Sequence, residues 1–253
     1  MTQLDGRNGP ALVFQDCTKS FRMKTGLVEA LKGLNLTVAQ GEVTGFLGPN
    51  GAGKTTAMHI LLGYQQATSG RAEIFGVDSR KSPARQRIGY LPEHPQLYGY
   101  LTAMELLKAA GGLFGINRKT LARRSGELLE RVGLAQAADR RIATFSRGML
   151  QRMGIAQALI NDPDLVVFDE PTNGLDPLGR LEVRRLIEEL RRDGKTVFFS
   201  SHELSEAERV CDHVVILAQG RVVAEGSVDE LVASGDSLER FFVRTVQQGG
   251  VSS

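Results

Sequence analysis

The residues best suited to chemistry lie between Gly48 and Thr56, where the sequence reads Gly-Pro-Asn-Gly-Ala-Gly-Lys-Thr-Thr. This order fits a phosphate-binding loop, which has a glycine, four further residues and then Gly-Lys-Ser/Thr. Glycines allow a tight turn without side chains, so that backbone N–H groups can point inward at an anion. The stretch, here called the phosphate loop, therefore predicts a cradle for the phosphates of a nucleotide.

Each position of the phosphate loop has an expected role toward ATP and Mg²⁺. Lys54 would reach the β- and γ-phosphates as a cation, and the Thr55 hydroxyl would ligate Mg²⁺. The other positions expected to contact the nucleotide are Gly48, Pro49, Asn50, Gly51, Ala52, Gly53 and Thr56. A dinucleotide-binding loop fits less well, because the third glycine of the pattern G-x-G-x-x-G is missing.

The segments on either side of the loop read as a strand and a helix. Residues 42–47 (EVTGFL) form a short apolar run, and Met58, Leu61 and Leu62 recur at helical spacing before Gly63. The N-terminus of such a helix would face the anion and stabilise it. This context favours a nucleotide site over a chance glycine-rich turn.

A second candidate cluster follows the apolar run at residues 165–168, where Asp169 and Glu170 stand side by side. Two acids after an apolar strand are often an ordinary strand end. Their combination with a phosphate loop instead predicts that Asp169 holds Mg²⁺ through water. Glu170 would then polarise the attacking water as general base.

His202 is the third candidate. It follows an apolar run at residues 196–199 and the pair Ser200-Ser201. A lone histidine after a strand is usually a surface or capping residue. Its position favours a role in catalysis, because parallel sheets bind ligands at the carboxyl ends of their strands.

The elements that must position these residues alternate between strand and helix. The apolar runs 165–168, 196–199 and 214–217 are typical of strands buried on both faces. This alternation around a phosphate loop predicts an α/β fold of the P-loop NTPase type with a mainly parallel sheet. Short runs at 11–14, 28–31, 34–38 and 71–75 predict an N-terminal antiparallel β subdomain.

Residues 93–160 read as an inserted, mostly helical subdomain. Thr102 and Glu105 form a capping box before an apolar stretch, and Ser146 is placed as the N-cap of a later helix. We expect one ATP-binding domain over residues 11–227, with a short C-terminal extension over 228–253. The extension has helical segments near 228–233 and 238–243.

Composition narrows the class of protein. The 253 residues include 31 basic and 29 acidic residues, for a net charge of +2, which gives no reason to expect nucleic acid as a partner. Two cysteines form no disulfide framework, so a reducing cytosol is expected. The sequence shows no signal peptide pattern and no apolar run long enough to span a membrane. We therefore expect a chain that is soluble by itself.

Taken together, the motifs resemble those of the ATP-binding subunit of an ABC transporter over about residues 12–243. They follow the order of that family: Walker A (48–55), Q-loop (90–93), signature (145–149), Walker B with its catalytic glutamate (165–170), D-loop (174–177) and switch histidine (201–202). The resemblance implies that Phe21 stacks on adenine, and that Ser146, Arg147, Gly148 and Asp176 also contribute to the nucleotide site.

Three positions depart from the family pattern. Glu93 replaces the usual glutamine of the Q-loop, and the resemblance implies a contact with the nucleotide and Mg²⁺ there. Arg147 replaces the first glycine of the signature, and Met149 replaces its glutamine. Replacements of this kind resemble the branch that serves ABC-2 type exporters.

The resemblance implies partners as well. ATP would lie between the phosphate loop of one subunit and the signature of a second ATP-binding subunit, alike or different. A membrane-spanning permease would complete the transporter and place this chain at the cytoplasmic face of the membrane. We expect a permease helix to dock beside residues 93–106.

Other classes of ATPase fit the sequence less well. Repair ATPases with the same cassette insert long coiled coils, and this chain lacks sustained heptads. Translation factors of the family carry two cassettes, whereas this chain carries one. A guanine-reading Asn-Lys-x-Asp motif is missing. A soluble assembly ATPase remains the alternative, to be separated from a transporter subunit by its co-purifying partners.

Overall fold

The computed structural model describes residues 9–24, 26–232 and 237–249. Contacts within the chain group these residues into two compact units. The first unit comprises the described residues of Met1–Arg85 and Thr196–Ser253, and the second comprises Gln86–Lys195. The predicted domain boundaries follow the family pattern rather than these contacts, and they stay a prediction.

An antiparallel sheet opens the first unit. Strand β1 (Leu12–Met23) lies between β2 (Gly26–Val38) and β4 (Ser69–Ile74), and the short β5 (Val77–Asp78) pairs with β4. The antiparallel arrangement was predicted, but the separate strands at 28–31 and 34–38 were wrong. They are one strand, because pairing with β1 continues through a bulge at Gly33, whose φ is 71°.

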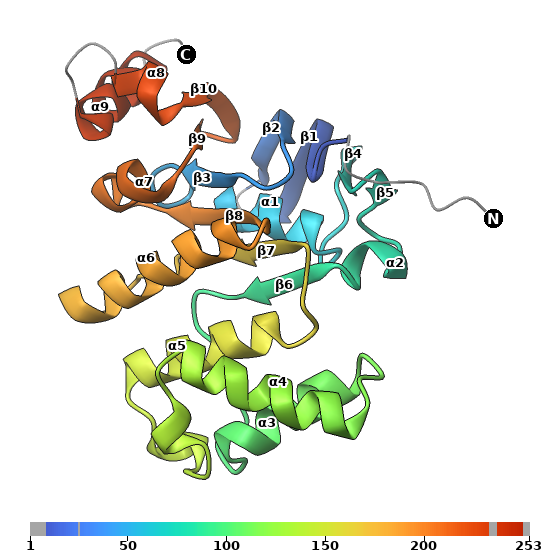
Figure 1. Cartoon of the computed structure of the whole chain (residues 1–253). Coiled ribbons are helices and arrows are strands. Elements are labelled where there is room, and N and C mark those ends of the chain that lie inside the picture. Colours follow the sequence, from blue (N-terminus) through green and yellow to red (C-terminus); the bar gives the residue numbers. More distant parts are fainter. Residues whose placement is uncertain (1–8, 25, 233–236, 250–253) are drawn as a thin grey trace. The chain divides into compact units, whose positions relative to one another are not determined.

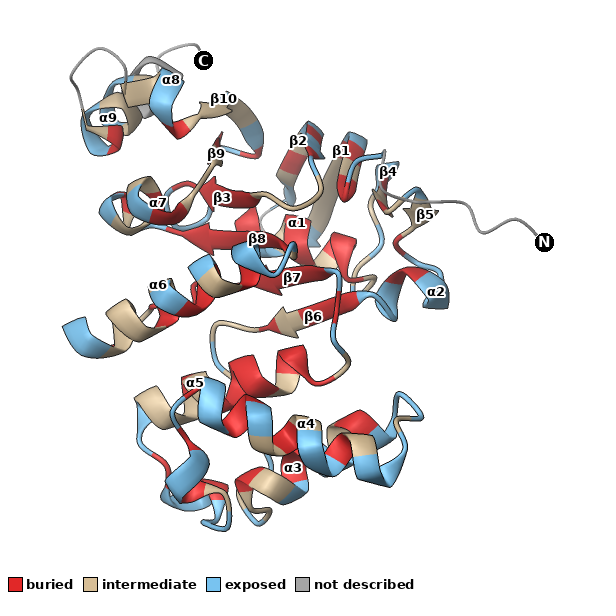
Figure 2. Cartoon of the chain, in the orientation of Figure 1, coloured by how far each residue is buried: buried red, intermediate tan, exposed pale blue. Residues whose placement is uncertain are grey.

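The parallel part of the first unit carries the phosphate loop. Strand β3 (Val43–Leu47) pairs in parallel with β8 (Thr196–Ser201) and with β9 (His213–Ala218), and β10 (Arg221–Ser227) closes this part as an antiparallel hairpin with β9. Every residue of β3 and β8 is buried, as Figure 2 shows. This confirms the prediction that continuous apolar runs form strands covered on both faces.

Helices of the first unit are mostly short. Helix α1 (Lys54–Leu61) was predicted and begins inside the phosphate loop, at Lys54. The helices α2 (Ser82–Arg85) and α7 (Leu204–Val210) were not predicted. At the C-terminal end lie α8 (Val228–Val232) and α9 (Leu238–Gly249). The predicted helix end at residue 233 lies outside the described residues, and α9 extends beyond the predicted residue 243.

The second unit combines two parallel strands with four α-helices and two turns of 3₁₀ helix among its residues. Strand β6 (Ile88–Leu91) pairs with β7 (Leu165–Phe168). Helices α3 (Ala103–Gly112), α4 (Arg118–Arg131) and α5 (Arg147–Leu159) pack against one another (Figure 1). The remaining elements of the unit are η1 (Ala135–Ala137), η2 (Ile142–Thr144) and α6 (Pro177–Arg192).

The predicted helix caps of the second unit are present. The Thr102 hydroxyl accepts a hydrogen bond from the Glu105 backbone N–H at 3.2 Å. The Glu105 carboxylate accepts one from the Thr102 N–H at 2.8 Å. Ser146 Oγ likewise accepts from the Met149 N–H at 3.3 Å at the start of α5. These bonds satisfy N–H groups that a helix N-terminus leaves without partners.

Both cysteines, Cys17 and Cys211, are free thiols. Burial raises the pKa of the Cys17 thiol to about 11. Burial, with a smaller contribution from the Asp212 carboxylate, also raises the pKa of the Cys211 thiol. Both therefore stay protonated at neutral pH and are unsuited to act as nucleophiles.

Among the described residues, no helix combines the length and the apolar character needed to cross a membrane.

Candidate functional site

The phosphate loop joins the end of β3 to the start of α1 through close backbone contacts. A Cβ atom at Gly53, whose φ is 109°, would lie 2.5 Å from the Ala30 carbonyl oxygen of β2. A Cβ at Gly48 would collide with the Leu217 carbonyl oxygen of β9. Glycine is therefore required at both positions, because the neighbouring strands leave no room for a side chain.

Lys54 is buried at the point where the loop enters α1, as the first residue of that helix. Its Nζ donates to the Gly48 carbonyl oxygen at 2.6 Å and lies 3.4 Å from the Pro49 carbonyl oxygen. Thr55, the next residue, is exposed at the first turn of α1. A cation enclosed by the loop, an exposed hydroxyl and a helix N-terminus match what a nucleotide phosphate chain needs, so these residues fit ATP.

Phe21 lies on β1 opposite Val28 of β2, and it is half-buried. Two residues further along β2, the Ala30 carbonyl contacts Gly53 of the phosphate loop. The Lys19 ammonium group lies 5.0 Å from the centre of the Phe21 ring. Phe21 thus lies on β1, and the neighbouring strand β2 borders the phosphate loop. This placement supports the predicted stacking on adenine.

His202 lies at the same sheet edge as the phosphate loop. Ser201, at the end of β8, is in register with Leu47, at the end of β3. Because the two strands are parallel, the residues that follow them leave the sheet at the same edge. His202 is exposed there, and the neighbouring Ser201 hydroxyl accepts a hydrogen bond from the Glu203 N–H at 2.9 Å.

The second unit holds the acidic pair at the end of β7. Both residues are buried: Asp169 is 3% exposed and Glu170 is 8% exposed. The Asp169 N–H donates to the Leu91 carbonyl oxygen at 2.9 Å, which continues the pairing of β7 with β6. Glu170 has a φ of 50°, a strained conformation for a residue with a side chain. Such strain often occurs at functional sites, and these carboxylate oxygens suit Mg²⁺.

Glu93 lies two residues beyond β6 and is engaged by a partner that the sequence did not reveal. Asn173 Nδ2 donates to Glu93 Oε1 at 2.8 Å, in a partly buried position. Asn173 belongs to the turn after Glu170. The Q-loop position of this chain is thus hydrogen-bonded to the segment that follows the acidic pair.

The signature residues begin α5 beside a cavity of about 380 Å³. Ser146 and Arg147 are exposed at the helix start, and Gly148 is half-buried. Asp176 lines the same cavity and caps α6, because its Oδ1 accepts from the Gly179 N–H at 2.7 Å. The structure therefore brings the signature and the D-loop position together within the second unit.

The two units divide the predicted site residues between them. The first holds Phe21, the phosphate loop and His202, and the second holds Glu93, the signature, the acidic pair and Asp176. Within the described part of the chain, no group of three or more His, Cys, Asp or Glu residues forms a metal site of its own. The expected Mg²⁺ ligands stay a prediction.

Comparison with known proteins identifies the family. The sequence model described as "ABC transporter" matches residues 31–173, which is more than half of the chain. The chain belongs to the ABC transporter family.

Three relatives of this ABC subunit illustrate the match. The ABC transporter ATP-binding protein all4389 of Nostoc sp. is 49% identical over 92% of this chain and 71% of its own length. NatA of Bacillus subtilis is 38% identical over 94% of this chain and 99% of its own length. The Nod factor export ATP-binding protein I of Cupriavidus metallidurans is 40% identical over 81% of this chain and 72% of its own length.

Solved structures agree with the fold. A solved structure of the ATP-binding subunit of an ABC transporter matches this chain with a TM-score of 0.84 and 32% sequence identity. The match covers 93% of this chain and 99% of that one. A dimeric ATP-binding cassette in a post-hydrolysis state, bound to ADP and Pi, has a TM-score of 0.79 and 27% identity, covering 86% and 98%. The predicted α/β P-loop NTPase fold is confirmed. The chain is an ATP-binding and ATP-hydrolysing subunit of an ABC transporter.

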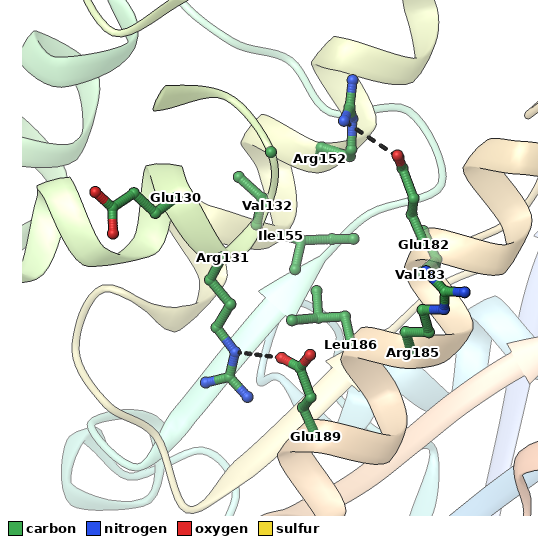
Figure 3. Close-up of a pocket in the computed structure, with 11 residues that line it drawn as sticks. Glu130, Arg131, Val132, Arg152, Ile155, Glu182, Val183, Arg185, Leu186 and Glu189 are labelled. Atoms are coloured by element: carbon green, nitrogen blue, oxygen red, sulfur yellow. Dashed lines mark hydrogen bonds and ion pairs between the residues drawn. The ribbon is translucent and has the colours of Figure 1, made fainter. Parts of the chain in front are cut away.

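A second cavity of this ABC subunit, of about 200 Å³, lies apart from the predicted chemistry. It has apolar walls that include Ile155 and Leu186, as Figure 3 shows. Two ion pairs with N–O distances of 3.1 Å cross it, Arg131 with Glu189 and Arg152 with Glu182. None of the predicted site residues lines it. We therefore interpret it as part of the packing of α4, α5 and α6.

Sequence reasoning missed one more residue of the site region. Gln151, one turn after Arg147 on α5, is buried and donates through Nε2 to the Pro171 carbonyl oxygen at 3.0 Å. A buried glutamine inside an otherwise apolar helix face is a signal for such a bond, because a buried amide needs a partner. The sequence alone did not say which one.

Proposed function

We propose that this subunit drives export by pairing head to tail with a second ATP-binding subunit when ATP binds. The observation that carries the proposal is the exposed start of α5 at Ser146 and Arg147, a second helix N-terminus suited to phosphate. A phosphate loop contacts a phosphate chain on one side only. The signature of a second subunit would cover the other side of the γ-phosphate, as the similarity to a dimeric cassette supports.

Each site residue has a role in this proposal. Lys54 would bind the β- and γ-phosphates, and Thr55 and Asp169 would hold Mg²⁺, with Glu93 as a further candidate ligand. The metal ion supplies charge neutralisation for the phosphates. Glu170 would take a proton from the attacking water, and His202 would contact the γ-phosphate region from the edge of β8.

A membrane-spanning permease would complete the transporter at the cytoplasmic face of the membrane. Residues 93–106 offer a docking surface there. Tyr98 and Tyr100 are 61% and 68% exposed, and their ring centres lie 5.7 Å apart. Exposed aromatic pairs are typical of contact surfaces. The relative named for Nod factor export supports export as the direction of transport.

Glu170→Gln tests the core of this proposal. The substitution removes the general base, which typically contributes a hundredfold or more to the rate, and leaves the binding groups in place. We expect ATPase activity to fall by about a hundredfold or more, and the ATP-bound protein to elute as a dimer in size-exclusion chromatography.

The double variant Glu170→Gln with Lys54→Ala is the control, because its weaker ATP binding should leave it monomeric at an ATP concentration that just saturates Glu170→Gln. A Glu170→Gln protein with unchanged turnover would contradict the assignment of the base. A protein that stays monomeric with ATP bound would contradict the pairing.

Affinity purification from its native membrane tests the partner. A tagged chain should recover an integral membrane protein, and charge reversal within residues 93–106 should reduce that recovery. Recovery of soluble partners alone would instead support the alternative of a soluble ABC-type ATPase.

A further inference from the structure

The residues that follow Glu170 form a tight turn that is hydrogen-bonded back to it. Residues 171–174 are here called the post-acid segment. The Asn173 backbone N–H donates to the Glu170 carbonyl oxygen at 3.1 Å. Glu170 and Gly174 have φ values of 50° and 69°. A displacement of this segment would therefore move the backbone that carries the Glu170 carboxylate.

Helix α5 holds the post-acid segment from one side through two side chains. Gln151 Nε2 donates to the Pro171 carbonyl oxygen at 3.0 Å, and Arg147 Nη2 donates to the Asn173 carbonyl oxygen at 3.5 Å. Residues 147 and 151 are four apart in α5, so they lie on one face of the helix. The first turns of the signature helix are thus hydrogen-bonded to the turn at residues 171 and 173.

Gly174 is part of the same contact. A Cβ atom at this position would fall against the Arg147 guanidinium, with Nε only 2.6 Å away. The guanidinium therefore occupies the space that a side chain at residue 174 would need. A glycine at position 147, as in the family signature, would leave this space empty.

Glu93 holds the post-acid segment from the side of β6. Its Oε1 accepts from Asn173 Nδ2 at 2.8 Å, while the Asn173 backbone carbonyl accepts from Arg147. Two of the three departures from the family pattern, Glu93 and Arg147, therefore meet on the same asparagine. Their common partner suggests a common purpose.

We propose that Glu93, Asn173 and Arg147 form a clamp that positions the backbone of Glu170 within one subunit. Each of the three is a positioning residue that acts through the post-acid segment. Glu93 serves as the hydrogen-bond acceptor for Asn173. The inference rests on the proposed role of Glu170 as general base.

The first test compares Glu93→Gln with Glu93→Ala in the full chain. The glutamine keeps a carbonyl oxygen that can accept from Asn173, whereas alanine removes the acceptor. We expect kcat for ATP to be about five- to tenfold lower in Glu93→Ala than in Glu93→Gln, because only the glutamine can still accept from Asn173. The dissociation constant for ATP, measured without Mg²⁺, should be the same in the two variants. An equal loss in the two variants would overturn the clamp, because it would show that the charge matters.

The second test combines Glu93→Ala with Asn173→Ala. Because the two side chains share one bond, the double variant should lose no more activity than either single variant. Losses that multiply would show that the residues act independently and would overturn the proposal.

The third test does not depend on ATPase activity. Amide hydrogen exchange of the ATP-free chain should become about tenfold faster over residues 170–176 in Arg147→Ala and Asn173→Ala. The strands β3 and β9 should be unaffected. Arg123→Ala is the control, because Arg123 is exposed and pairs only with Glu127 on α4 among the ion pairs described.

These readouts separate the two ideas. If the wild-type chain had no ATPase activity but the two variants still exchanged faster than it over residues 170–176, the proposed function would be contradicted and the clamp would stand. Unchanged exchange in Arg147→Ala and Asn173→Ala would overturn the clamp whatever the activity.

Discussion

At the scale of single residues, the phosphate loop shows how few side chains are needed to prepare an anion site. Glycines at positions 48 and 53 allow the loop to approach β9 and β2, and Lys54 points its ammonium group into the turn. The two carbonyl oxygens near Lys54 Nζ hold the cation inside the loop before any phosphate arrives. This arrangement reduces the ordering needed on binding.

Lys54→Ala removes that cation. Hydrogen bonds from a charged group typically contribute about 1.5–3 kcal/mol, so ATP affinity should fall about 10- to 100-fold. Equilibrium binding of a fluorescent ATP analogue measures the loss. Lys108→Ala, on the exposed face of α3, is the matched control and should bind as wild type does. Equal affinity in the two variants would contradict the role given to Lys54.

Phe21 has a different expected role, because an aromatic ring recognises the base and not the phosphates. Stacking of a base on an aromatic side chain contributes about 1–3 kcal/mol, so Phe21→Ala should weaken ATP binding at least about fivefold. Phe21→Trp should retain most of the affinity. Binding of inorganic triphosphate, which has no base, should be equal in all three proteins. A loss for triphosphate as well would mean that the substitution disturbs the loop through β2.

At the scale of elements, the capping box of α3 is a local feature with a measurable contribution. Thr102→Ala removes the hydroxyl that accepts from the Glu105 N–H at 3.2 Å. We expect the free energy of unfolding of the full chain to fall by about 1 kcal/mol, measured in urea. Thr102→Ser keeps the hydroxyl and should lose much less. Equal stability of Thr102→Ala and wild type would show that water replaces the cap without loss.

Elements with strong periodicity or a strong motif were predictable from the sequence. The apolar runs that became β7, β8 and β9, and the caps at Thr102 and Ser146, needed only local information. The helices α2 and α7, of 4 and 7 residues, are too short to show a helical period. The continuous strand β2 was missed because Gly33 reads as a turn, and only pairing with β1 shows that it is a bulge.

The site residues also divide into those that a local sequence pattern predicts and those that depend on long-range contacts. Motif residues such as Lys54 and Glu170 were predicted from local patterns, because phosphate and magnesium chemistry restricts the residue types. The contacts of Gln151 and Asn173 were not, because their partners lie 20 and 80 residues away in the sequence. Hydrogen bonds over such distances depend on how helices and strands pack, which no local pattern contains.

At the scale of the whole molecule, the proposed function makes each ATP site a joint product of two chains. The phosphate loop belongs to the first unit and the signature to the second unit. In a head-to-tail pair, each site would take its phosphate loop from one subunit and its signature from the other. A defect in one motif therefore affects one site of a mixed pair, and this property distinguishes composite sites from independent ones.

Mixing two inactive variants tests this arrangement. Lys54→Ala disables the phosphate loop. Gly148→Asp places a negative charge where the signature would meet the γ-phosphate. The fold should accept this aspartate, because a Cβ at Gly148 contacts only Leu175, at 3.7 Å, and an acidic residue suits a helix N-terminus.

In a mixed pair one site carries both defects and the other is intact. Either variant alone should hydrolyse subsaturating ATP at about 1–10% of the wild-type rate, in line with the loss of a charged phosphate contact. An equal mixture should form half of its pairs as mixed ones, each with one intact site, and so recover activity to about a quarter of the wild-type rate if the sites act independently. Recovery would be diagnostic of a site shared between chains, because two defective chains with separate sites have no intact site to contribute. A mixture that stays as inactive as its components, while chemical cross-linking shows mixed pairs, would contradict the head-to-tail arrangement.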